Sequence, residues 1–392
     1  MLAGNVSVDV EGDTLFIRGN NSSNHIEITQ TGEDTYVVTG VDTDINGDEE
    51  EFVADDIRNI NINLKDGNDS VTIGTSFDPA TGGLDGLDTL DPVNDFSLEG
   101  DLLIKTGDDK DDVAVSADVG GILRIDTGDQ GDDVLVANSD VDDDLLILTF
   151  DGNDDVVVDG TVVGDLLLID SDDGDDSATV TGSVAGHAII DLGDDEDIVD
   201  VDGLSLDREL TIVTGRDDDE VTIVAVEGEN VTINTGNDED RVNVAEVFVE
   251  NDFVLVTGSG KDRIDVDTIE ANTAVVNSGS DRDRLDLANF VLDRDAVVVT
   301  GSGNDDLVAS NFDVGHNAVF DAGSGDDEFV LDAILVDEVL TVVMGSGDDT
   351  LTISASSANE ANLIGGSGKD RYIDGGNDFD DEDEDFEQHS SI

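Results

Sequence analysis

Apolar and polar residues alternate along most of this chain in short runs that recur at a fixed step. Phe253 and Leu255 before the glycine-rich turn at 258–262, and Ile264 and Val266 after it, place hydrophobic residues at every second position. A period of two residues predicts β-strands that turn one set of side chains inward. Glycines in the turn permit positive φ angles and a close approach of the backbone. Each repeat is therefore expected to contain two strands joined by a tight turn.

The step of the repeat is set by one aspartate that follows each turn. From Asp111 onward these aspartates are separated by 21 or 22 residues, and Asp69 precedes Asp111 by two such steps. A period of this kind indicates a solenoid in which each repeat is one coil stacked on the last. The recurring aspartates are Asp69, Asp111, Asp132, Asp154, Asp176, Asp197, Asp219, Asp240, Asp262, Asp283, Asp305, Asp327, Asp349 and Asp370.

The other columns of the repeat predict the fold. Isoleucine or leucine recurs seven residues before the aspartate, as at Ile104, and valine recurs two residues after it, as at Val113. Threonine recurs five residues before it, as at Thr106 and Thr257, with the parity of the inward residues. The remaining leg of each coil is short and less regular. We expect an all-β, right-handed parallel β-helix of about 14–15 coils with 21–22 residues per coil.

Three segments depart from the repeat. Residues 1–60 contain short strand patterns without the periodic aspartate and are expected to form an N-terminal β cap over the first coil. The solenoid is expected over residues 61–373, with a degenerate coil and an insertion at 74–100 that contains both prolines. Residues 374–392 form an acidic tail, expected to be mobile or loosely packed as a C-terminal cap.

The composition excludes several classes of function. The 392 residues include 99 aspartates and glutamates but only 16 lysines and arginines, for a net charge of −83. Such a charge argues against nucleic-acid binding and against binding to anionic membranes. No apolar run approaches the roughly 18 residues of a membrane span. The charge instead favours cation binding, a saline environment, or both.

The aspartate column is the candidate functional site. Carboxylates stacked about 4.8 Å apart, one strand spacing, repel each other unless something neutralises them. Ca²⁺ binds six to eight oxygen atoms, and a turn of this kind supplies both carbonyl and carboxylate oxygens. With no cysteine and four histidines, the chain is poor in ligands for softer metals. The alternative is a ladder in which each aspartate only accepts hydrogen bonds from nearby backbone N–H groups.

The later turns resemble the RTX calcium-binding nonapeptide repeats. The resemblance implies that turn carbonyls and aspartate side chains hold several Ca²⁺ ions between successive coils. Two features depart from the RTX pattern. Each coil has one such turn rather than two, and the second glycine is replaced in six coils by Asp109, Gln130, Asp195, Asp217, Asp238 or Asp281. These side chains are expected to be extra ligands or solvated groups. The matching glycines are Gly258, Gly260, Gly301, Gly303, Gly323, Gly325, Gly345, Gly347, Gly366 and Gly368.

A second resemblance concerns the start of the chain. The segments 2–6 and 15–19, together with the coil opening at 68–71, are similar to the mature start of large secreted β-solenoid proteins of planctomycete bacteria. This resemblance implies an extracellular or cell-surface location and no defined activity.

Arginine occupies the position after the aspartate in three consecutive coils, at Arg241, Arg263 and Arg284. The favoured interpretation is that these residues neutralise an acidic face locally. The alternative is a lyase site, because pectate-lyase-like β-helices combine carboxylate-bound Ca²⁺ with an arginine base. An active site is expected to interrupt a repeat at one place, and no such interruption is evident here. We therefore expect the protein not to be an enzyme.

A column with outward parity, eight residues before the aspartate, is unusually apolar. It includes Leu103, Leu146, Val254, Val275 and Val297. The first explanation is the β-propensity of such residues in an exposed sheet. The alternative is a contact with a second copy of the chain or another partner, since apolar patches tend to mark interaction surfaces.

The sequence thus predicts an extracellular, calcium-binding β-solenoid with a structural, adhesive or matrix-forming role. Ca²⁺ would lie between successive Gly-x-Gly-x-Asp turns. Two other functions remain open. One is a β-helix that binds or cleaves polysaccharide, and the other is an acidic, salt-adapted spacer without a specific metal.

Overall fold

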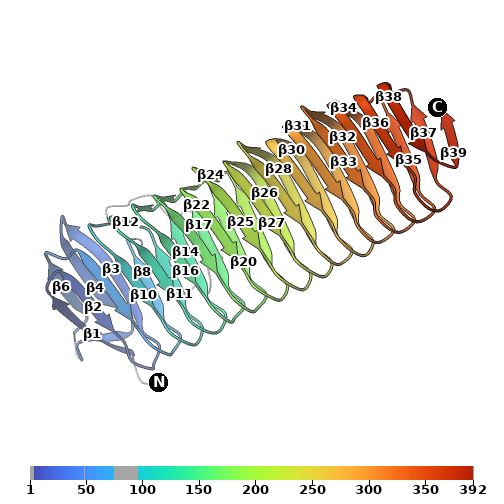
Figure 1. Cartoon of the computed structure of the whole chain (residues 1–392). Helices are drawn as coiled ribbons and strands as arrows, with labels where there is room; N and C mark the ends of the chain where they lie inside the picture. The colour runs from blue at the N-terminus through green and yellow to red at the C-terminus, as the bar shows by residue number, and fades with distance from the viewer. Residues whose placement is uncertain (1–3, 48, 75–95, 392) are drawn as a thin grey trace. The chain divides into compact units, whose positions relative to one another are not determined.

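The computed structural model describes residues 4–47, 49–74 and 96–391, and every regular element in these ranges is a β-strand. The chain divides into two compact units, Met1–Asp207 and Arg208–Ile392. In each unit parallel strands lie side by side, coil upon coil (Figure 1). The predicted all-β parallel solenoid is confirmed, with about 13 turns, close to the expected number. Within the described ranges, no helix has the length and hydrophobicity needed to cross a membrane.

In the first unit each coil has three faces. Strands before the glycine turn form face A, strands after the aspartate form face B, and short return strands form face C. Face A comprises β7 (Asn59–Asn63), β10 (Leu102–Lys105), β13 (Leu123–Asp126), β16 (Leu145–Leu148), β19 (Leu166–Asp170) and β22 (His187–Asp191). Face B comprises β8 (Ser70–Ile73), β11 (Asp112–Val115), β14 (Asp133–Ala137), β17 (Asp155–Asp159), β20 (Ser177–Thr181) and β23 (Ile198–Asp202). Face C comprises β9 (Ser97–Leu98), β12 (Asp118–Val119), β15 (Asp140–Val141), β18 (Val162–Val163), β21 (Val184–Ala185) and β24 (Ser205–Leu206).

In the second unit strands run from one face into the next. Face A contains β25 (Glu209–Val213), β27 (Asn230–Asn234), β29 (Asp252–Val256) and β33 (Asn317–Asp321). Faces B and C are joined in β26 (Glu220–Gly228), β28 (Arg241–Val249) and β32 (Asp306–Val314). Three strands continue into face A of the next coil, namely β30 (Arg263–Asn277), β31 (Arg284–Val299) and β34 (Glu328–Val343). The last coils contain β35 (Thr350–Ser354), β36 (Ser357–Ile364), β37 (Arg371–Gly375), β38 (Asp378–Asp385) and β39 (Gln388–Ser391).

The core is the stack of inward side chains at equal positions of successive coils. Ile104 on β10 pairs in register with Ile125 on β13, which pairs with Ile147 on β16. All three are buried. Identical aliphatic side chains in register fill the thin interior without gaps, and the alternation on each strand fixes this register.

The return leg is a third strand rather than an irregular connection. It is separated from face B by a corner residue in the left-handed region, such as Thr268 with φ of 63° or Asn289 with φ of 59°. In the first unit the return strands contain only two residues. A period of two cannot be detected over so short a run, so the alternation of residues could not predict this face.

Residues 4–55 contain the antiparallel pairs of the structure, β1 (Gly4–Glu11) with β2 (Thr14–Arg18), and β4 (Thr35–Gly40) with β3 (His25–Gly32) and β6 (Glu51–Asp55). Strands β2 and β3 also pair in parallel with β7 and β8, so they open the solenoid. Strand β5 (Thr43–Ile45) pairs in parallel with β1. These hairpins lie at the blue end of the first unit (Figure 1).

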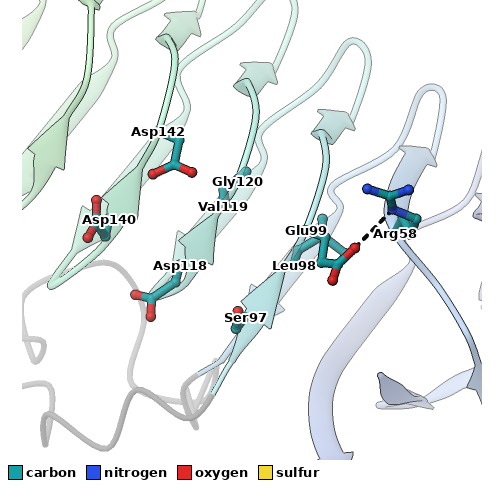
Figure 2. Close-up of a pocket in the computed structure, with 9 residues that line it drawn as sticks. All are labelled: Arg58, Ser97, Leu98, Glu99, Asp118, Val119, Gly120, Asp140 and Asp142. Atoms are coloured by element: carbon teal, nitrogen blue, oxygen red, sulfur yellow. Dashed lines mark ion pairs between the residues drawn. The ribbon is translucent and has the colours of Figure 1, made fainter. Parts of the chain in front are cut away.

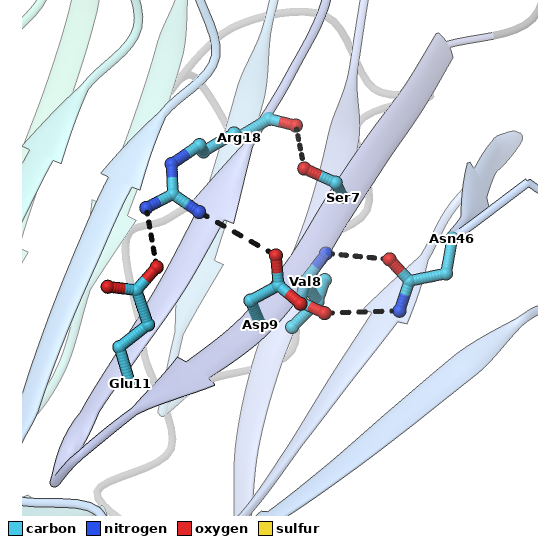
Figure 3. Close-up of polar contacts among 6 residues, drawn as sticks. All are labelled: Ser7, Val8, Asp9, Glu11, Arg18 and Asn46. Carbon is cyan, nitrogen blue, oxygen red and sulfur yellow. Dashed lines mark hydrogen bonds and ion pairs between the residues drawn. The ribbon is translucent and has the colours of Figure 1, made fainter.

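Polar side chains form hydrogen bonds and ion pairs with residues of β1 (Figure 3). The side-chain amide of Asn46 accepts from Val8 N at 2.9 Å and donates to Val8 O at 3.2 Å. Arg18 forms ion pairs with Asp9 at 3.9 Å and Glu11 at 3.8 Å. A side chain that satisfies both backbone groups of an outer strand leaves that edge less able to pair with another chain. This arrangement is what a cap requires, while the boundary at residue 60 stays a prediction.

The other two irregular segments differ in how far they can be described. Most of the predicted insertion at 74–100 lies outside the described residues, since the structure describes nothing between 74 and 96. The acidic segment at the C-terminus, expected to be mobile or loosely packed, adds further strands to the ladder. Strand β38 pairs in parallel with β36, and β39 pairs with β37. Its carboxylates are mostly exposed, so the backbone ladder holds them without burying them.

Candidate functional site

All of the recurring aspartates are buried at the turn between face A and face B. Each lies directly before a face B strand, as Asp262 does before β30. The buried set is Asp69, Asp111, Asp132, Asp154, Asp176, Asp197, Asp219, Asp240, Asp262, Asp283, Asp305, Asp327, Asp349 and Asp370. The structure thus places every predicted aspartate at an equivalent, desolvated position. The inward row of threonine hydroxyls expected beside them is also buried, as at Thr106 and Thr257.

One oxygen of each carboxylate links neighbouring coils. The backbone N–H of Asp69 donates to Oδ1 of Asp111 at 2.6 Å, and that of Asp327 donates to Oδ1 of Asp349 at 2.9 Å. The same bond recurs along the first unit up to Asp197 and along the second unit from Asp219 to Asp370. The hydrogen-bonded ladder, weighed above as an alternative to metal binding, is therefore present and occupies Oδ1.

The ladder is closed at both ends by other side chains. In the first unit the backbone N–H of Asn24 donates to Oδ1 of Asp69 at 2.7 Å. In the second unit the N–H of Asp370 donates to Oε2 of Glu387 at 2.8 Å. Glu387 thus takes the place of the missing aspartate of a further coil.

The second oxygen, Oδ2, has different surroundings from coil to coil. The threonine five residues earlier donates its hydroxyl to Oδ2 in three coils of the second unit. These bonds join Thr214 to Asp219, Thr235 to Asp240, and Thr257 to Asp262, at 2.5–2.6 Å. In these coils both carboxylate oxygens have a donor.

In other coils of the described ranges Oδ2 has no donor, including coils that carry Thr106 or Thr300, and in some of them the hydroxyl itself is absent. The position five residues before the aspartate is Leu64 for Asp69, Ala322 for Asp327 and Met344 for Asp349. In each case Oδ2 is buried and finds no hydrogen-bond donor among the described residues. A buried carboxylate oxygen without a donor costs free energy. These coils need a proton or a cation at Oδ2, because the protein supplies no donor.

Burial raises the pKa of these carboxyl groups well above the ordinary aspartate value of 3.8. The pKa of Asp69 is raised to about 7, and that of Asp327 also to about 7. For Asp327, loss of solvent is the main cause and the neighbouring Asp305 and Asp349 raise the pKa further, while the Asp305 N–H lowers it. Asp132 reaches about 9, again mainly through burial. Near neutral pH the ladder therefore readily takes up positive charge in the form of protons or metal ions.

The turn fits a hard cation in two respects. It provides buried carboxylate oxygens without donors at Asp69, Asp327 and Asp349, and the same turn contains the backbone carbonyls of its glycine-rich segment. Within the described ranges, no three His, Cys, Asp or Glu side chains gather in the arrangement of a metal site. An ion at one of these aspartates would therefore take most of its oxygen ligands from the backbone, as Ca²⁺ readily does.

The glycines of the turn adopt the conformation predicted for them. Gly258, Gly301, Gly323, Gly345 and Gly366 have φ of 82–97°. At the second glycine position two conformations occur. Gly260, Gly303, Gly325, Gly347 and Gly368 have φ of 137–153°, whereas Asp109, Gln130, Asp195, Asp217, Asp238 and Asp281 have φ of 73–93°.

These two conformations explain why only some coils have glycine at the second position. A Cβ atom at Gly260 would lie 1.8 Å from the carbonyl oxygen of Asp238 in the preceding coil. Asp238 itself avoids such a clash because its φ of 80° is near the left-handed region that aspartate tolerates. The side chains of these six residues are exposed or half-exposed, so they face solvent instead of the buried aspartates.

A second ladder runs along the outside of the turn and was missed by the sequence analysis. In several coils the residue before the buried aspartate donates its N–H to the side chain of its counterpart in the preceding coil, opposite to the direction of the aspartate ladder. Lys369 also donates in this way, although it has no acceptor side chain of its own. The N–H of Glu239 donates to Oδ1 of Asp218 at 2.8 Å, and that of Asp348 donates to Oδ1 of Asp326 at 2.8 Å. The sequence signal was the frequency of Asp, Asn and Glu at this position, which the high acidic content obscured.

The outward column eight residues before the aspartate is half-buried rather than freely exposed. Val254, Val275, Val297 and Val319 occupy equal positions of neighbouring strands in the second unit. Leu103, Leu146 and Leu168 occupy the same column in the first unit. Part of this apolar area is covered by neighbouring side chains of the sheet itself. Self-association through this column stays a prediction.

An acidic groove lies on face C of the first unit (Figure 2). Its volume is about 510 Å³, and its lining includes Arg58, Glu99, Asp118, Asp140 and Asp142. Arg58 forms an ion pair with Glu99 at 3.0 Å. Burial, and then the charges of Asp140 and Asp142, raise the pKa of Asp118. The groove is open and its lining is mainly acidic, so it attracts positively charged ligands more than negatively charged ones.

Comparisons with known proteins add little beyond the fold. No protein-family model matches the chain, and no curated protein matches it. Among solved structures, the chain is similar to the X-ray crystal structure of a hyperactive, Ca²⁺-dependent, β-helical antifreeze protein from an Antarctic bacterium. The two share 16% sequence identity with a TM-score of 0.39, over 90% of this chain and 80% of the other. The strand pairing described above defines the fold without this likeness.

A threonine hydroxyl introduced beside Asp327 tests whether its Oδ2 lacks a hydrogen-bond donor. In a chelator at about pH 8.5, we expect Ala322→Thr to stabilise the second unit by about 1 kcal/mol, the usual net value of one hydrogen bond. The expected bond is the one that Thr257 makes to Asp262 at the equivalent position. Thr300 in the neighbouring coil shows that the larger side chain fits the stack, although its hydroxyl donates to the carbonyl of Ala322. Thermal unfolding measures the effect, and Ala322→Val is the control of equal shape. Equal stabilisation by valine would show that packing, and not a donor to Asp327, is what the site lacks.

Proposed function

We propose that this protein is a calcium-binding β-solenoid with a structural, adhesive or matrix-forming role outside the cell. The observation that carries the calcium proposal is the buried, donorless Oδ2 of Asp69, Asp327 and Asp349. The glycine-rich turns beside these atoms support it, because they offer carbonyl oxygens of the kind that Ca²⁺ selects. The extracellular location is proposed from the similarity of segments 2–6, 15–19 and 68–71 to secreted β-solenoid proteins of planctomycete bacteria.

The proposed role of Ca²⁺ is to neutralise the ladder and to stabilise the stack. When bound, the ion would supply positive charge to carboxylates that the protein itself leaves uncompensated. Asp327 and Asp349 would hold it through Oδ2 while their Oδ1 atoms keep the bonds between coils. The unfolded chain has no such turn, so the free energy of binding adds to that of folding.

A titration of unfolding tests the proposal. We expect Ca²⁺ to raise the unfolding temperature far more than Mg²⁺ or Na⁺ at matched ionic strength. At a free concentration one hundred times Kd, each site adds about 2.7 kcal/mol. One kcal/mol corresponds to roughly 2–4 °C for a domain of 150–250 residues, so a single site shifts the midpoint by roughly 5–10 °C. An equal response to every salt would favour the salt-adapted spacer instead.

Replacement of one ladder aspartate separates the ion from general screening. Asp327→Asn keeps the oxygen that accepts the Asp305 N–H and removes the buried charge. We expect this variant to melt at or above the wild-type temperature in a chelator, and below it with Ca²⁺. The matched control is Asp337→Asn, which removes one exposed charge from β34 and is expected to shift both conditions by the same small amount. If Asp327→Asn melted lower by the same amount in both, the ladder would be structural without the metal.

A further inference from the structure

The basic residues of this acidic protein are concentrated in a few coils of the second unit. Of the 16 lysines and arginines, five fall between residues 241 and 284: Arg241, Lys261, Arg263, Arg282 and Arg284. Arg241, Arg263 and Arg284 begin β28, β30 and β31 and are paired in register, residue to residue. Their side chains are exposed. The three guanidinium groups thus form one row, here called the arginine row, at a spacing of about 4.8 Å per coil.

The arginine row has no carboxylate partner, in contrast to the cations beside it. Lys261 pairs with Glu239 at 3.0 Å, and Arg282 pairs with Asp306 at 2.7 Å. None of the ion pairs within 4.0 Å in the described ranges involves a residue of the arginine row. The interpretation that these arginines neutralise an acidic face stays a prediction, since exposed Asp265 and Asp286 lie two residues further along β30 and β31 without a close ion pair to the row. Three like charges side by side repel each other, and an anion placed across them would relieve that repulsion.

The row has defined ends. Along the same column Arg241 pairs in register with Glu220 on one side, and Arg284 pairs with Asp306 on the other. A ligand that extends beyond the three arginines therefore meets negative charge. At physiological ionic strength the Debye length is about 8 Å, so a ligand on the row is exposed mainly to the arginines and their immediate neighbours. This favours a short anionic segment over a long, densely charged polymer.

The chemistry of the row suits oxyanions such as carboxylates and phosphates, so the spacing of the ligand's charges has to decide between them. The planar guanidinium group donates two parallel hydrogen bonds to one carboxylate, and arginine is preferred where such a fork is used. A linear chain with one carboxylate per sugar residue repeats its charges at a distance comparable to the spacing of the coils. Nucleic acid fits less well, because its continuous phosphate backbone would run onto Glu220 and Asp306.

We propose that Arg241, Arg263 and Arg284 form a binding surface for a short stretch of an acidic polysaccharide that carries one carboxylate per sugar. Each arginine contacts the carboxylate of one sugar residue. This surface is independent of the calcium ladder, because the arginine side chains point outward from the strands while the aspartates are buried. No bond is made or broken in the proposed interaction.

The proposal is tested with the full chain and trigalacturonate as the probe, by isothermal titration at low ionic strength with Ca²⁺ held constant. We expect binding that weakens as salt is added, with no binding of the neutral galactose trimer. Replacing all three arginines by serine should reduce the affinity by about a hundredfold, or roughly fivefold for each exposed pair lost. Replacing them by lysine should restore part of the affinity, because the charge remains and the fork is lost.

The control removes three other positive charges. Lys261→Ser, Arg282→Ser and Lys369→Ser together change the net charge equally and leave the arginine row intact, so this variant should bind trigalacturonate within a fewfold of the wild type. The melting temperature of each variant confirms that it is folded. An equal loss in the control, undiminished binding by the triple serine variant, or tighter binding of a single-stranded oligonucleotide than of trigalacturonate would overturn the proposal. So would an absence of binding by the wild type at low salt.

Discussion

In the presence of a chelator, the protein should unfold at a markedly lower temperature at about pH 8.5 than at about pH 5. The cause is the buried ladder, whose carboxyl groups have a raised pKa in the folded state. The pKa is about 7 for Asp283 and about 8 for Asp111, Asp176 and Asp240, against 3.8 for an ordinary aspartate. For a group with a raised folded pKa, stability is fully present below the unfolded value and is lost as the pH rises through the folded value. The loss therefore begins near pH 4, the unfolded value, and is nearly complete at about pH 8, where the highest of these folded values lies, so most of it falls between pH 5 and pH 8.5.

Exposed carboxylates do not produce the same effect in this range. A carboxyl group in water is ionised throughout this range, so repulsion among exposed carboxylates changes little between about pH 5 and pH 8.5. Added Ca²⁺ should restore the stability lost at the higher pH, since the ion replaces the protons of the ladder and releases them on binding. Thermal unfolding at several pH values, with and without Ca²⁺ at matched ionic strength, measures both effects. A flat profile in the chelator, or greater stability at the higher pH, would contradict this account of the ladder.

Replacing Phe312 by alanine should destabilise the second unit by about 3–5 kcal/mol. Phe312 is buried and stacks on Phe290, with ring centroids 4.4 Å apart and planes inclined by 9°. It also contacts Phe320 at 5.9 Å between centroids. Neighbouring buried side chains cannot move into the cavity easily, because each is already packed against the equivalent residues of the coils above and below it. At roughly 2–4 °C per kcal/mol, the midpoint should fall by roughly 10 °C.

This loss should be independent of calcium, which distinguishes the core from the ladder. We expect the same decrease for Phe312→Ala in Ca²⁺ and in chelator, whereas changes in the aspartate ladder act differently in the two. Phe248→Ala is the control, because Phe248 is 39% exposed on face C of the same unit and should cost much less. A decrease for Phe312→Ala that appears only in the chelator would mean that the ion, and not the packed interior, maintains the stack.

The pattern of residues determined most of the architecture. A step of 21–22 residues, with inward aliphatic columns such as Ile104, Ile125 and Ile147, leaves few folds other than a stack of parallel coils, because only equivalent positions can bury such columns together. The same step placed every recurring aspartate at one point of the turn. The return strand on face C could not be predicted in this way, because in the first unit it contains only two residues and an alternation cannot be detected over so short a segment.

The tertiary structure decided how each aspartate is used. A sequence shows that Asp327 follows a glycine turn, but only the stacking of coils shows that its Oδ1 accepts the N–H of Asp305 while its Oδ2 is buried without a donor. A threonine five positions earlier does not ensure a donor to Oδ2, because the hydroxyl of Thr257 reaches Asp262 whereas that of Thr300 donates to the carbonyl of Ala322.

Side-chain positions likewise decide that Lys261 forms an ion pair with Glu239 and Arg282 with Asp306. They also decide that the arginine row forms none within the described residues. Charge and spacing are written in the sequence, whereas desolvation and hydrogen-bond partners arise only when the coils are stacked.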